Sequence, residues 1–235
     1  MVEFPTILCS GGGMSIEKNI AIIKENINNV GFNDNEKFDI SNIIIASKNQ
    51  PIERIREVNQ ILKPNVFGEN IAQEFRAKYD SSYTWDFIGR LQTNKIKYLV
   101  AKTRYIQSID SRDQCVEIER ICRNNNLSQG IFIEVNAGKE LNKGGIFPND
   151  VMSFYESIRD SFKFITIEGL MIVAPKKLDG YYIKDTFFHA KDLFDSLNLI
   201  DKNIKYLSMG MSEDYIEALE CGSNMLRLGR AIFKD

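Results

Sequence analysis

The order of short apolar runs and helical patterns constrains the fold of this chain more than any other feature of its sequence. Eight runs rich in aliphatic and aromatic residues alternate with segments of helical spacing, and no break in composition divides them. Such alternation predicts parallel strands joined by crossover helices, and eight units of this kind close naturally into a barrel. The predicted strands are residues 43–47, 66–68, 85–88, 105–109, 131–135, part of 164–173, 204–207 and 225–228.

The expected fold class is therefore α/β, as a single (β/α)8 TIM barrel with an extra N-terminal helix that begins at Ser15. We expect residues 1–14 to form a flexible N-terminal arm and residues 15–235 to form the barrel domain. An open doubly wound sheet is the alternative, but it usually has fewer strands, and no glycine-rich dinucleotide turn follows the first strand here. The other predicted helices are residues 51–62, 69–79, 93–101, 110–122, 148–160, 182–197 and 212–220.

Charge and cysteine usage exclude several classes of function. The net charge of −2 argues against nucleic acid and anionic membranes as partners. No apolar stretch approaches the length that crosses a membrane. The four cysteines lack paired-ligand spacing, and a lone His189 cannot complete a zinc site, so no metal is expected. Reduced thiols fit a cytoplasmic protein.

Lys48 stands at the exit of the first apolar run, Ile43-Ile44-Ile45-Ala46. A lysine is poorly placed there for core packing, and we expect its amine to be drawn from water into the mouth of a pocket. Desolvation favours the neutral amine, which is the form that attacks a carbonyl carbon. The alternative is a surface lysine that caps a strand.

Other polar residues also follow the predicted strands, where a barrel of this kind builds its active face. Glu69-Asn70 follows the second strand, Gly89-Arg90 the third, and Asn136 with Lys143-Gly144-Gly145 the fifth. Ser208-Met209-Gly210-Met211-Ser212 follows the seventh and Gly229-Arg230 the eighth. Because polar residues recur after so many of the predicted strands, we expect a functional site at this end of the barrel.

The last two segments have the character of a phosphate site. Glycine lets successive backbone N–H groups converge on an anion, and a helix that starts near Ser212 would add its N-terminal amides and a hydroxyl donor. Barrels often bind phosphate with the loops after strands seven and eight. In the alternative interpretation, Gly210 and Gly229 only turn the chain and Ser212 only caps a helix. Together with Lys48, these loops predict a Schiff base with a phosphorylated aldehyde.

Several motifs, in this order, resemble those of the pyridoxal phosphate homeostasis proteins, and the resemblance spans residues 15–233. The motifs are Ala46-Ser47-Lys48, Phe67-Gly68-Glu69-Asn70, Phe87-Ile88-Gly89 with Leu91-Gln92-Thr93-Asn94-Lys95, Lys143-Gly144-Gly145, Glu168-Gly169-Leu170-Met171, residues 207–212 and Leu226-Arg227-Leu228-Gly229-Arg230. The resemblance implies a barrel like the large domain of alanine racemase, with pyridoxal 5′-phosphate (PLP) on a lysine.

Carried over residue by residue, the resemblance makes Lys48 the Schiff-base lysine. It assigns the phosphate to Ser212 and the Gly229-Arg230 amides, places Arg227 opposite the pyridine nitrogen and lets Asn70 line the cofactor. The full set of expected cofactor-binding residues is Lys48, Asn70, Met211, Ser212, Arg227, Gly229 and Arg230.

The sequence departs from the family pattern at several positions. Asp86, Arg90 and Val66 stand where histidines are common, and Arg230 replaces a Thr or Ser that often donates a hydroxyl to the phosphate. Arginine at position 230 could supply charge in place of that hydroxyl. The chain also ends at Phe233-Lys234-Asp235, without the glycine and arginine usual after that phenylalanine.

The resemblance implies a PLP carrier that acts in vitamin B6 and amino-acid homeostasis, with apo PLP-enzymes and amino acids as possible partners. Arg227 can only donate, so it would keep the pyridine nitrogen unprotonated and weaken carbanion stabilisation. Because nothing in the sequence supplies a second acid/base, we expect no efficient catalysis. The alternatives are a PLP-dependent amino-acid racemase and a phosphate-binding barrel enzyme such as an aldolase. We expect a monomer.

Overall fold

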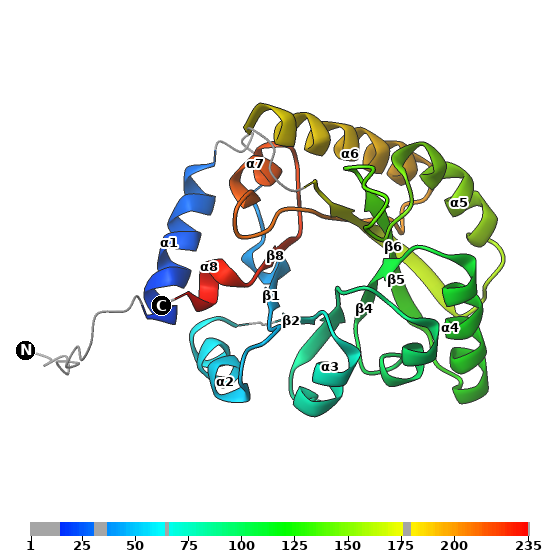
Figure 1. Ribbon diagram of the computed structural model, residues 1–235, viewed down its shortest axis with the longest axis horizontal. Coiled ribbons are helices and arrows are strands. Elements are labelled where there is room, and N and C mark those ends of the chain that lie inside the picture. Colours follow the sequence, from blue (N-terminus) through cyan, green and yellow to red (C-terminus); the bar gives the residue numbers. More distant parts are fainter. Residues whose placement is uncertain (1–14, 31–36, 64–65, 176–179, 235) are drawn as a thin grey trace, which may run out of the picture.

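In the computed structural model, eight parallel strands form a nearly closed ring that helices surround (Figure 1). The structure describes residues 15–30, 37–63, 66–175 and 180–234, so the predicted arm, residues 1–14, lies outside the described residues. The predicted TIM barrel is confirmed. Its strands are β1 (Ile43–Ala46), β2 (Val66–Glu69), β3 (Thr84–Phe87), β4 (Tyr105–Ile109), β5 (Gln129–Asn136), β6 (Ile165–Val173), β7 (Tyr206–Ser208) and β8 (Leu226–Leu228).

The helices follow the strands along the chain and cover the outside of the ring (Figure 1). Three short 3-10 helices supplement them: η1 (Ile40–Asn42), η2 (Thr93–Tyr98) and η3 (Pro148–Asp150). The α-helices are α1 (Ile16–Asn29), α2 (Ile52–Ile61), α3 (Ala72–Lys78), α4 (Arg112–Asn125), α5 (Val151–Ile158), α6 (Gly180–Ile200), α7 (Tyr215–Glu220) and α8 (Arg230–Phe233).

The strands pair in the order β7-β6-β5-β4-β3-β2-β1-β8, which is sequence order except that β8 lies beside β1. The ring is completed between β7 and β8 by one bridge, Ser208 with Met225, and by a hydrogen bond from the Met209 amide to the Met225 carbonyl of 3.1 Å. Consecutive strands are neighbours because each crossover helix returns the chain to the same end of the sheet. All strand exits therefore lie at one end of the barrel.

The strands place their side chains in two different apolar regions. In β1, Ile43 and Ile45 belong to the large core between strands and helices, whereas Ile44 belongs to a smaller cluster contributed by the strands and their ends. That smaller cluster fills the inside of the ring, where Phe132 and Tyr206 stack with ring centroids 5.8 Å apart. Both faces are buried, as expected for parallel strands that read as continuous apolar runs.

The extra N-terminal helix, α1, packs against the C-terminal helix α8. Ser15 begins α1 by accepting a hydrogen bond from the Lys18 amide at 3.3 Å. The buried isoleucines of α1, which face the core, are Ile16, Ile20, Ile23 and Ile27. The buried Asn19 side chain donates to the carbonyl oxygens of Ile232 (3.0 Å) and Lys234 (2.8 Å). These bonds hold the chain that leaves β8 against the side of the barrel.

Three predicted helix boundaries are wrong. Residues 93–101 form the 3-10 helix η2 and then turns in place of an α-helix, and Glu69 belongs to strand β2. The helix expected at Ser212 begins only at Tyr215.

Candidate functional site

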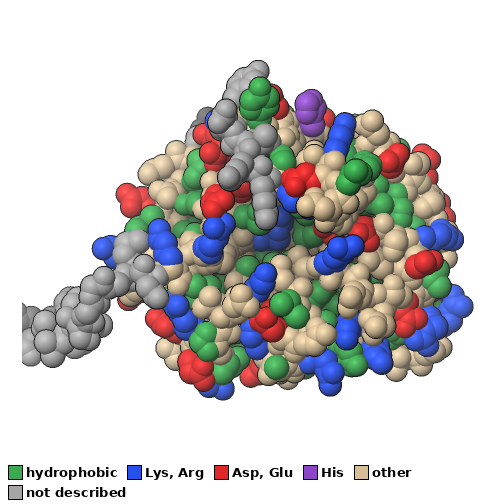
Figure 2. Space-filling view, in the orientation of Figure 1, with side chains coloured by type: hydrophobic (Ala, Val, Ile, Leu, Met, Phe, Trp, Pro, Cys, Tyr) green, Lys and Arg blue, Asp and Glu red, His purple; other side chains and the backbone are tan. Residues whose placement is uncertain are grey.

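The pairing of β1 with β8 brings the two predicted parts of the site together. Ile45 lies opposite Leu228 in parallel register, so Lys48 and Gly229 leave the sheet side by side. A cavity of about 750 Å³ opens here, within the size range of small-molecule sites. Figure 2 shows a hollow near the middle of this face, with Lys and Arg side chains inside and around it. The cavity is lined by all of the predicted binding residues: Lys48, Asn70, Met211, Ser212, Arg227, Gly229 and Arg230.

Lys48 is exposed in a turn at the rim of the cavity, so the prediction that its amine is drawn out of water is wrong. The Gln50 amide donates to the Ser47 carbonyl at 3.0 Å, and Asn49 has a φ of 59°. This tight turn after β1 directs the chain away from the sheet. An accessible amine on a fixed turn can meet a carbonyl compound that enters from solvent.

A buried carboxylate holds the turn of Lys48 from beneath. Glu69 is fully buried, and its Oε1 accepts from Ser47 Oγ at 2.9 Å and from Lys78 Nζ at 2.8 Å. The same lysine donates to the Ser47 carbonyl and to Glu74, whose other bond is to the Asn49 amide. Sequence reasoning missed this support because Glu69 was assigned to a helix.

Asn70 is half-buried and follows β2 at the cavity wall. Its amide donates to Glu69 Oε2 at 3.1 Å, so the carboxylate that holds the Lys48 turn also holds Asn70. Gly89 passes so close that a Cβ there would lie 1.9 Å from the Asn70 carbonyl oxygen. The glycine after β3 therefore sets the position of Asn70.

Gly89→Ala should destabilise the protein by about 3 kcal/mol, because the new methyl group overlaps backbone that cannot move without displacing Asn70. Urea unfolding would measure the loss. Gly144→Ala is the matched control, since its nearest neighbour would be the Asp110 carboxylate at 3.1 Å. Equal stability of the two variants would contradict a backbone clash at Gly89.

The loops after β7 and β8 are joined to each other. Ser212 Oγ accepts a hydrogen bond from the Ala231 amide in α8 at 3.0 Å, and the Arg227 amide donates to the Gly210 carbonyl at 3.0 Å. Gly210 has a φ of +93°, which favours glycine, and a Cβ there would meet Ala218 at 2.6 Å. Ser212 therefore joins the two loops through the first turn of α8 and does not begin a helix of its own, since α7 starts only at Tyr215.

Met211 and Arg230 reach the cavity from its outer edge. Met211 is exposed, and its amide donates to Asp214 Oδ1 at 2.6 Å. Arg230 forms an exposed ion pair with Glu213 at 2.8 Å. The charge that Arg230 was expected to offer a phosphate is thus shared with a carboxylate, although an exposed pair of this kind is weak.

Arg227 lies on β8 at the floor of the cavity and is buried. Its Nη1 donates to the Ser208 carbonyl (2.6 Å) and hydroxyl (2.8 Å), and its Nη2 donates to the Ile172 carbonyl (2.8 Å). Burial lowers the pKa of Arg227 to about 10, although the carboxylates of Asp214 and Glu134 act to raise it. The guanidinium therefore remains charged at neutral pH and is fixed by bonds to β6 and β7.

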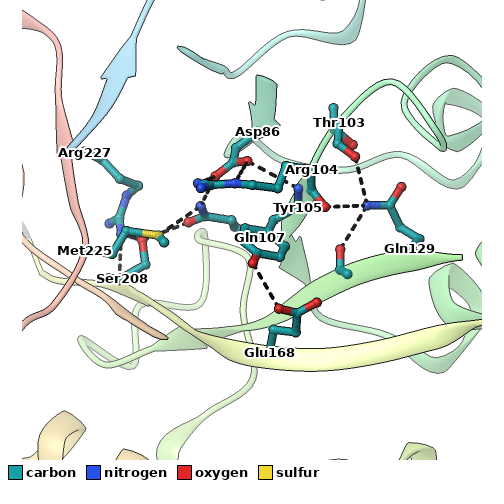
Figure 3. A network of polar contacts seen from close by, with 11 residues as sticks. Asp86, Thr103, Arg104, Tyr105, Gln107, Gln129, Glu168, Ser208, Met225 and Arg227 are labelled. Carbon is teal, nitrogen blue, oxygen red and sulfur yellow. Dashed lines mark hydrogen bonds and ion pairs between the residues drawn. The ribbon is translucent and has the colours of Figure 1, made fainter. Parts of the chain in front are cut away.

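A chain of polar side chains runs from Arg227 through the inside of the barrel (Figure 3). Ser208 Oγ donates to Gln107 Oε1 at 2.8 Å, and Gln107 Nε2 donates to Asp86 Oδ2 at 2.8 Å. Asp86 is fully buried and accepts two bonds from Arg104, at 3.1 and 2.9 Å. Each group in this series donates to the next one in the direction of Asp86. The Asp86 carboxylate only accepts, so the series of hydrogen bonds ends there.

Glu134 is a further residue at the cavity that sequence reasoning missed. It lies on β5 and lines the cavity with Met171 and Val173 of β6. Side chains of a strand point alternately to its two faces, and Phe132 of β5 points into the ring. Glu134 lies two residues after Phe132, and this spacing was the signal in the sequence that it also points inward. By contrast, Asn136 and Lys143 from the predicted ring bond to their own loop and to the Ala174 carbonyl.

Two absences concern the described residues alone. Within residues 15–30, 37–63, 66–175 and 180–234, no group of three or more His, Cys, Asp or Glu side chains could hold a metal ion. In the same part of the chain, no helix has the length and apolar character needed to span a membrane.

Comparison with known proteins supports a defined class. Residues 67–235 match the family model described as alanine racemase, N-terminal domain. The pyridoxal phosphate homeostasis protein of Aquifex aeolicus (strain VF5) is 38% identical over 196 residues, which cover 81% of this chain and 85% of that protein. The protein of the same name from Helicobacter pylori (strain ATCC 700392 / 26695) is 33% identical over 201 residues, covering 83% and 88%.

Solved structures agree with this assignment. PipY of Synechococcus elongatus PCC7942, solved with PLP bound, is 27% identical with a TM-score of 0.78, covering 93% of this chain and all (100%) of that one. An alanine racemase of Clostridium difficile 630 is 14% identical with a TM-score of 0.69, covering 92% and 55%, and shows the fold alone. Fold and cavity thus define a barrel of the alanine racemase N-terminal-domain class. Within that class, the chain belongs to the pyridoxal phosphate homeostasis protein family.

Proposed function

We propose that this protein binds pyridoxal 5′-phosphate and carries it as an aldimine of Lys48, in the service of vitamin B6 and amino-acid homeostasis and without efficient catalysis. The observation that carries the proposal is the single cavity that Lys48 shares with the loops after β7 and β8. The PLP-bound structure of the relative PipY and the name of the curated relatives support the same ligand.

The residues present suit this cofactor. Lys48 offers an accessible amine to an aldehyde, and the paired loops around Ser212 and Gly229 offer a hydroxyl and backbone amides to a phosphate. Arg227 is held at the floor in reach of a ring, and Asn70 forms a side wall. When bound, PLP supplies an electron sink, which is weak where the ring nitrogen faces a donor such as arginine.

Lys48→Ala should abolish formation of a yellow holoprotein. After incubation with PLP and dialysis, the wild-type protein should be yellow and bleach with borohydride, whereas the variant should retain no absorbance from the cofactor. Lys63→Ala, an exposed lysine after α2, is the matched control and should behave as wild type. Identical colourless spectra for wild type and Lys48→Ala would overturn the proposal.

Ser212→Ala should weaken cofactor retention about tenfold while preserving the fold, because it removes one hydrogen bond to a charged phosphate and the tie to the Ala231 amide. Equilibrium dialysis with PLP would measure the change, with circular dichroism as a check on folding. Ser153→Ala, on the exposed face of α5, is the control. Retention equal to wild type would remove Ser212 from the phosphate site.

An amino-acid racemase is the alternative, and the Glu134 carboxyl in the cavity is the observation that favours it. Solvent deuterium exchange at the α-carbon of alanine separates the two functions. We expect exchange far slower than an enzyme achieves, and exchange at enzyme-like rates would replace the carrier by the racemase. Apo PLP-enzymes as recipients and a monomeric state complete the proposal, and analytical ultracentrifugation tests the latter.

A further inference from the structure

A second cavity lies between the segments that follow β2 and β3, and we call it the β2–β3 cavity. Its volume is about 250 Å³, and among the described residues it shares only Asn70 with the lining of the larger cavity. Its other polar lining residues are Gln73, Arg90, Gln92 and Lys95. Gln92 and Lys95 belong to the motif Leu91-Gln92-Thr93-Asn94-Lys95, which has no part in the proposed cofactor site. The β2–β3 cavity is therefore distinct from that site.

The charge of the β2–β3 cavity is positive. Arg90 and Lys95 both line it, whereas no Asp or Glu side chain does so in the part of the chain that the structure describes. Within the same residues, neither of these two side chains forms a hydrogen bond or an ion pair. Glu134 is in electrostatic reach of Arg90, but it lines the larger cavity. Two cations without a carboxylate partner favour an anionic ligand.

The segment that carries Arg90 is fixed by hydrogen bonds on both sides. Before it, the Ile88 amide donates to the Glu69 carbonyl at 2.9 Å. After it, the Leu91 carbonyl accepts from Nε2 of the buried Gln114 side chain at 3.1 Å. A ligand therefore does not have to order this segment when it binds, which lowers the entropic cost of binding.

The second cation, Lys95, is positioned by the 3-10 helix η2. Its amide donates to the Gln92 carbonyl at 2.9 Å, and the next residue, Ile96, is fully buried. Lys95 is half-buried at the cavity, whereas Lys97 of the same helix is exposed and lies over the Tyr98 ring, 5.2 Å from its centroid. The two lysines of η2 thus differ in whether they line the cavity, and Lys97 provides a matched control.

We propose that the β2–β3 cavity binds a phosphate dianion, either inorganic phosphate or the phosphate group of a small ester. A guanidinium offers paired N–H donors to phosphate oxygens, and the ammonium of Lys95 adds a second positive charge, so the pair suits a dianion better than a carboxylate. Gln73 and Gln92 can supply neutral amide donors. The cavity is smaller than most sites for drug-sized ligands, so the ligand is small.

Titration of the apo-protein with inorganic phosphate, followed by NMR of the backbone amides, tests the proposal. The amide signals of Arg90 and Gln92 should shift and saturate with phosphate, but not with chloride at the same ionic strength. Arg90→Gln should raise the Kd measured at the Gln92 amide at least about tenfold, as expected for loss of a hydrogen bond to a charged group. Lys95→Gln should also raise this Kd, whereas Lys97→Gln should bind phosphate as wild type does.

A second titration, with glycerol 3-phosphate, distinguishes the two sources of the dianion. Tighter binding of the ester would assign the site to a phosphorylated small molecule, and tighter binding of inorganic phosphate would assign it to the free ion; either order supports the site. Equal shifts with chloride and phosphate would overturn the proposal. An unchanged Kd in both Arg90→Gln and Lys95→Gln would also overturn it.

The larger cavity is followed in the same spectra through the Gly229 amide. Because Lys48 and the loops after β7 and β8 do not line the β2–β3 cavity, Arg90→Gln should leave any phosphate-induced shift of Gly229 unchanged. Shifts at Gly229 without shifts at Arg90 or Gln92 would contradict the proposal and leave the cofactor site intact. Failure of the proposed function is seen separately, as the absence of a mass increase after borohydride treatment with PLP.

Discussion

Glu134→Gln should make the protein more stable at pH 8, by about 3 kcal/mol, and change its stability by less than about 1 kcal/mol at pH 5. Burial and Asp110 raise the pKa of Glu134 from an ordinary value of 4.5 to about 7 in the folded protein. The folded state therefore binds this proton more tightly than the unfolded state. The stability that the folded protein gains from binding this proton more tightly is fully present below pH 4.5 and is lost as the pH rises through 7.

Urea unfolding of the apo-protein at both pH values measures the effect, with the glutamine variant as a neutral side chain of the same shape. Glu168→Gln serves as the control, because the Glu168 carboxylate accepts a hydrogen bond from the Tyr105 hydroxyl. A difference between Glu134→Gln and wild type that does not vary with pH would show that Glu134 has no raised pKa. Loss of stability at pH 8 would mean that its carboxylate has a protein partner.

Asp86→Ala should destabilise the protein by about 3 kcal/mol. Asp86 is fully buried and compensates both the Arg104 guanidinium and the Gln107 amide inside the barrel. Its removal leaves a cation without a partner, although the Arg104 side chain is 28% exposed and recovers part of its hydration. A second substitution, Arg104→Ala, should cost less in the Asp86→Ala background than alone.

An arginine–carboxylate pair on the surface of the protein serves as the control for the buried pair of Asp86 and Arg104. Arg120 grips Glu117 with two bonds of 2.7 Å on α4, where the arginine side chain is 58% exposed. Glu117→Ala should therefore change the free energy of unfolding by no more than about 0.5 kcal/mol. Similar losses for Asp86→Ala and Glu117→Ala would show that burial of Asp86 adds nothing.

The sequence predicted the barrel because its strands are buried on both faces and read as apolar runs. It also predicted the residues that share the cavity, since parallel strands all end at one side of the sheet. The boundaries of helices and strands were harder to predict where short elements are followed by turns. The expected helix at residues 93–101 is the 3-10 helix η2, because tertiary packing of Ile96 outweighs a weak helical pattern.

Other features depend on contacts between distant residues. Ser212 resembles a helix cap in sequence, but its hydroxyl bonds to Ala231 across the gap between two loops. The exposure of Lys48 follows from the turn that Glu69 and Lys78 hold. Glu134 sits within an apolar strand, and only the ring of strands determines that its side chain reaches the cavity.

The most direct test of the central claim is to locate the reduced cofactor on the chain. The wild-type protein is incubated with PLP, treated with borohydride, weighed intact by mass spectrometry and then digested with trypsin. We predict one added phosphopyridoxyl group per chain, located on Lys48. Its recovery on any other side chain, or an unchanged intact mass, would contradict the proposed function.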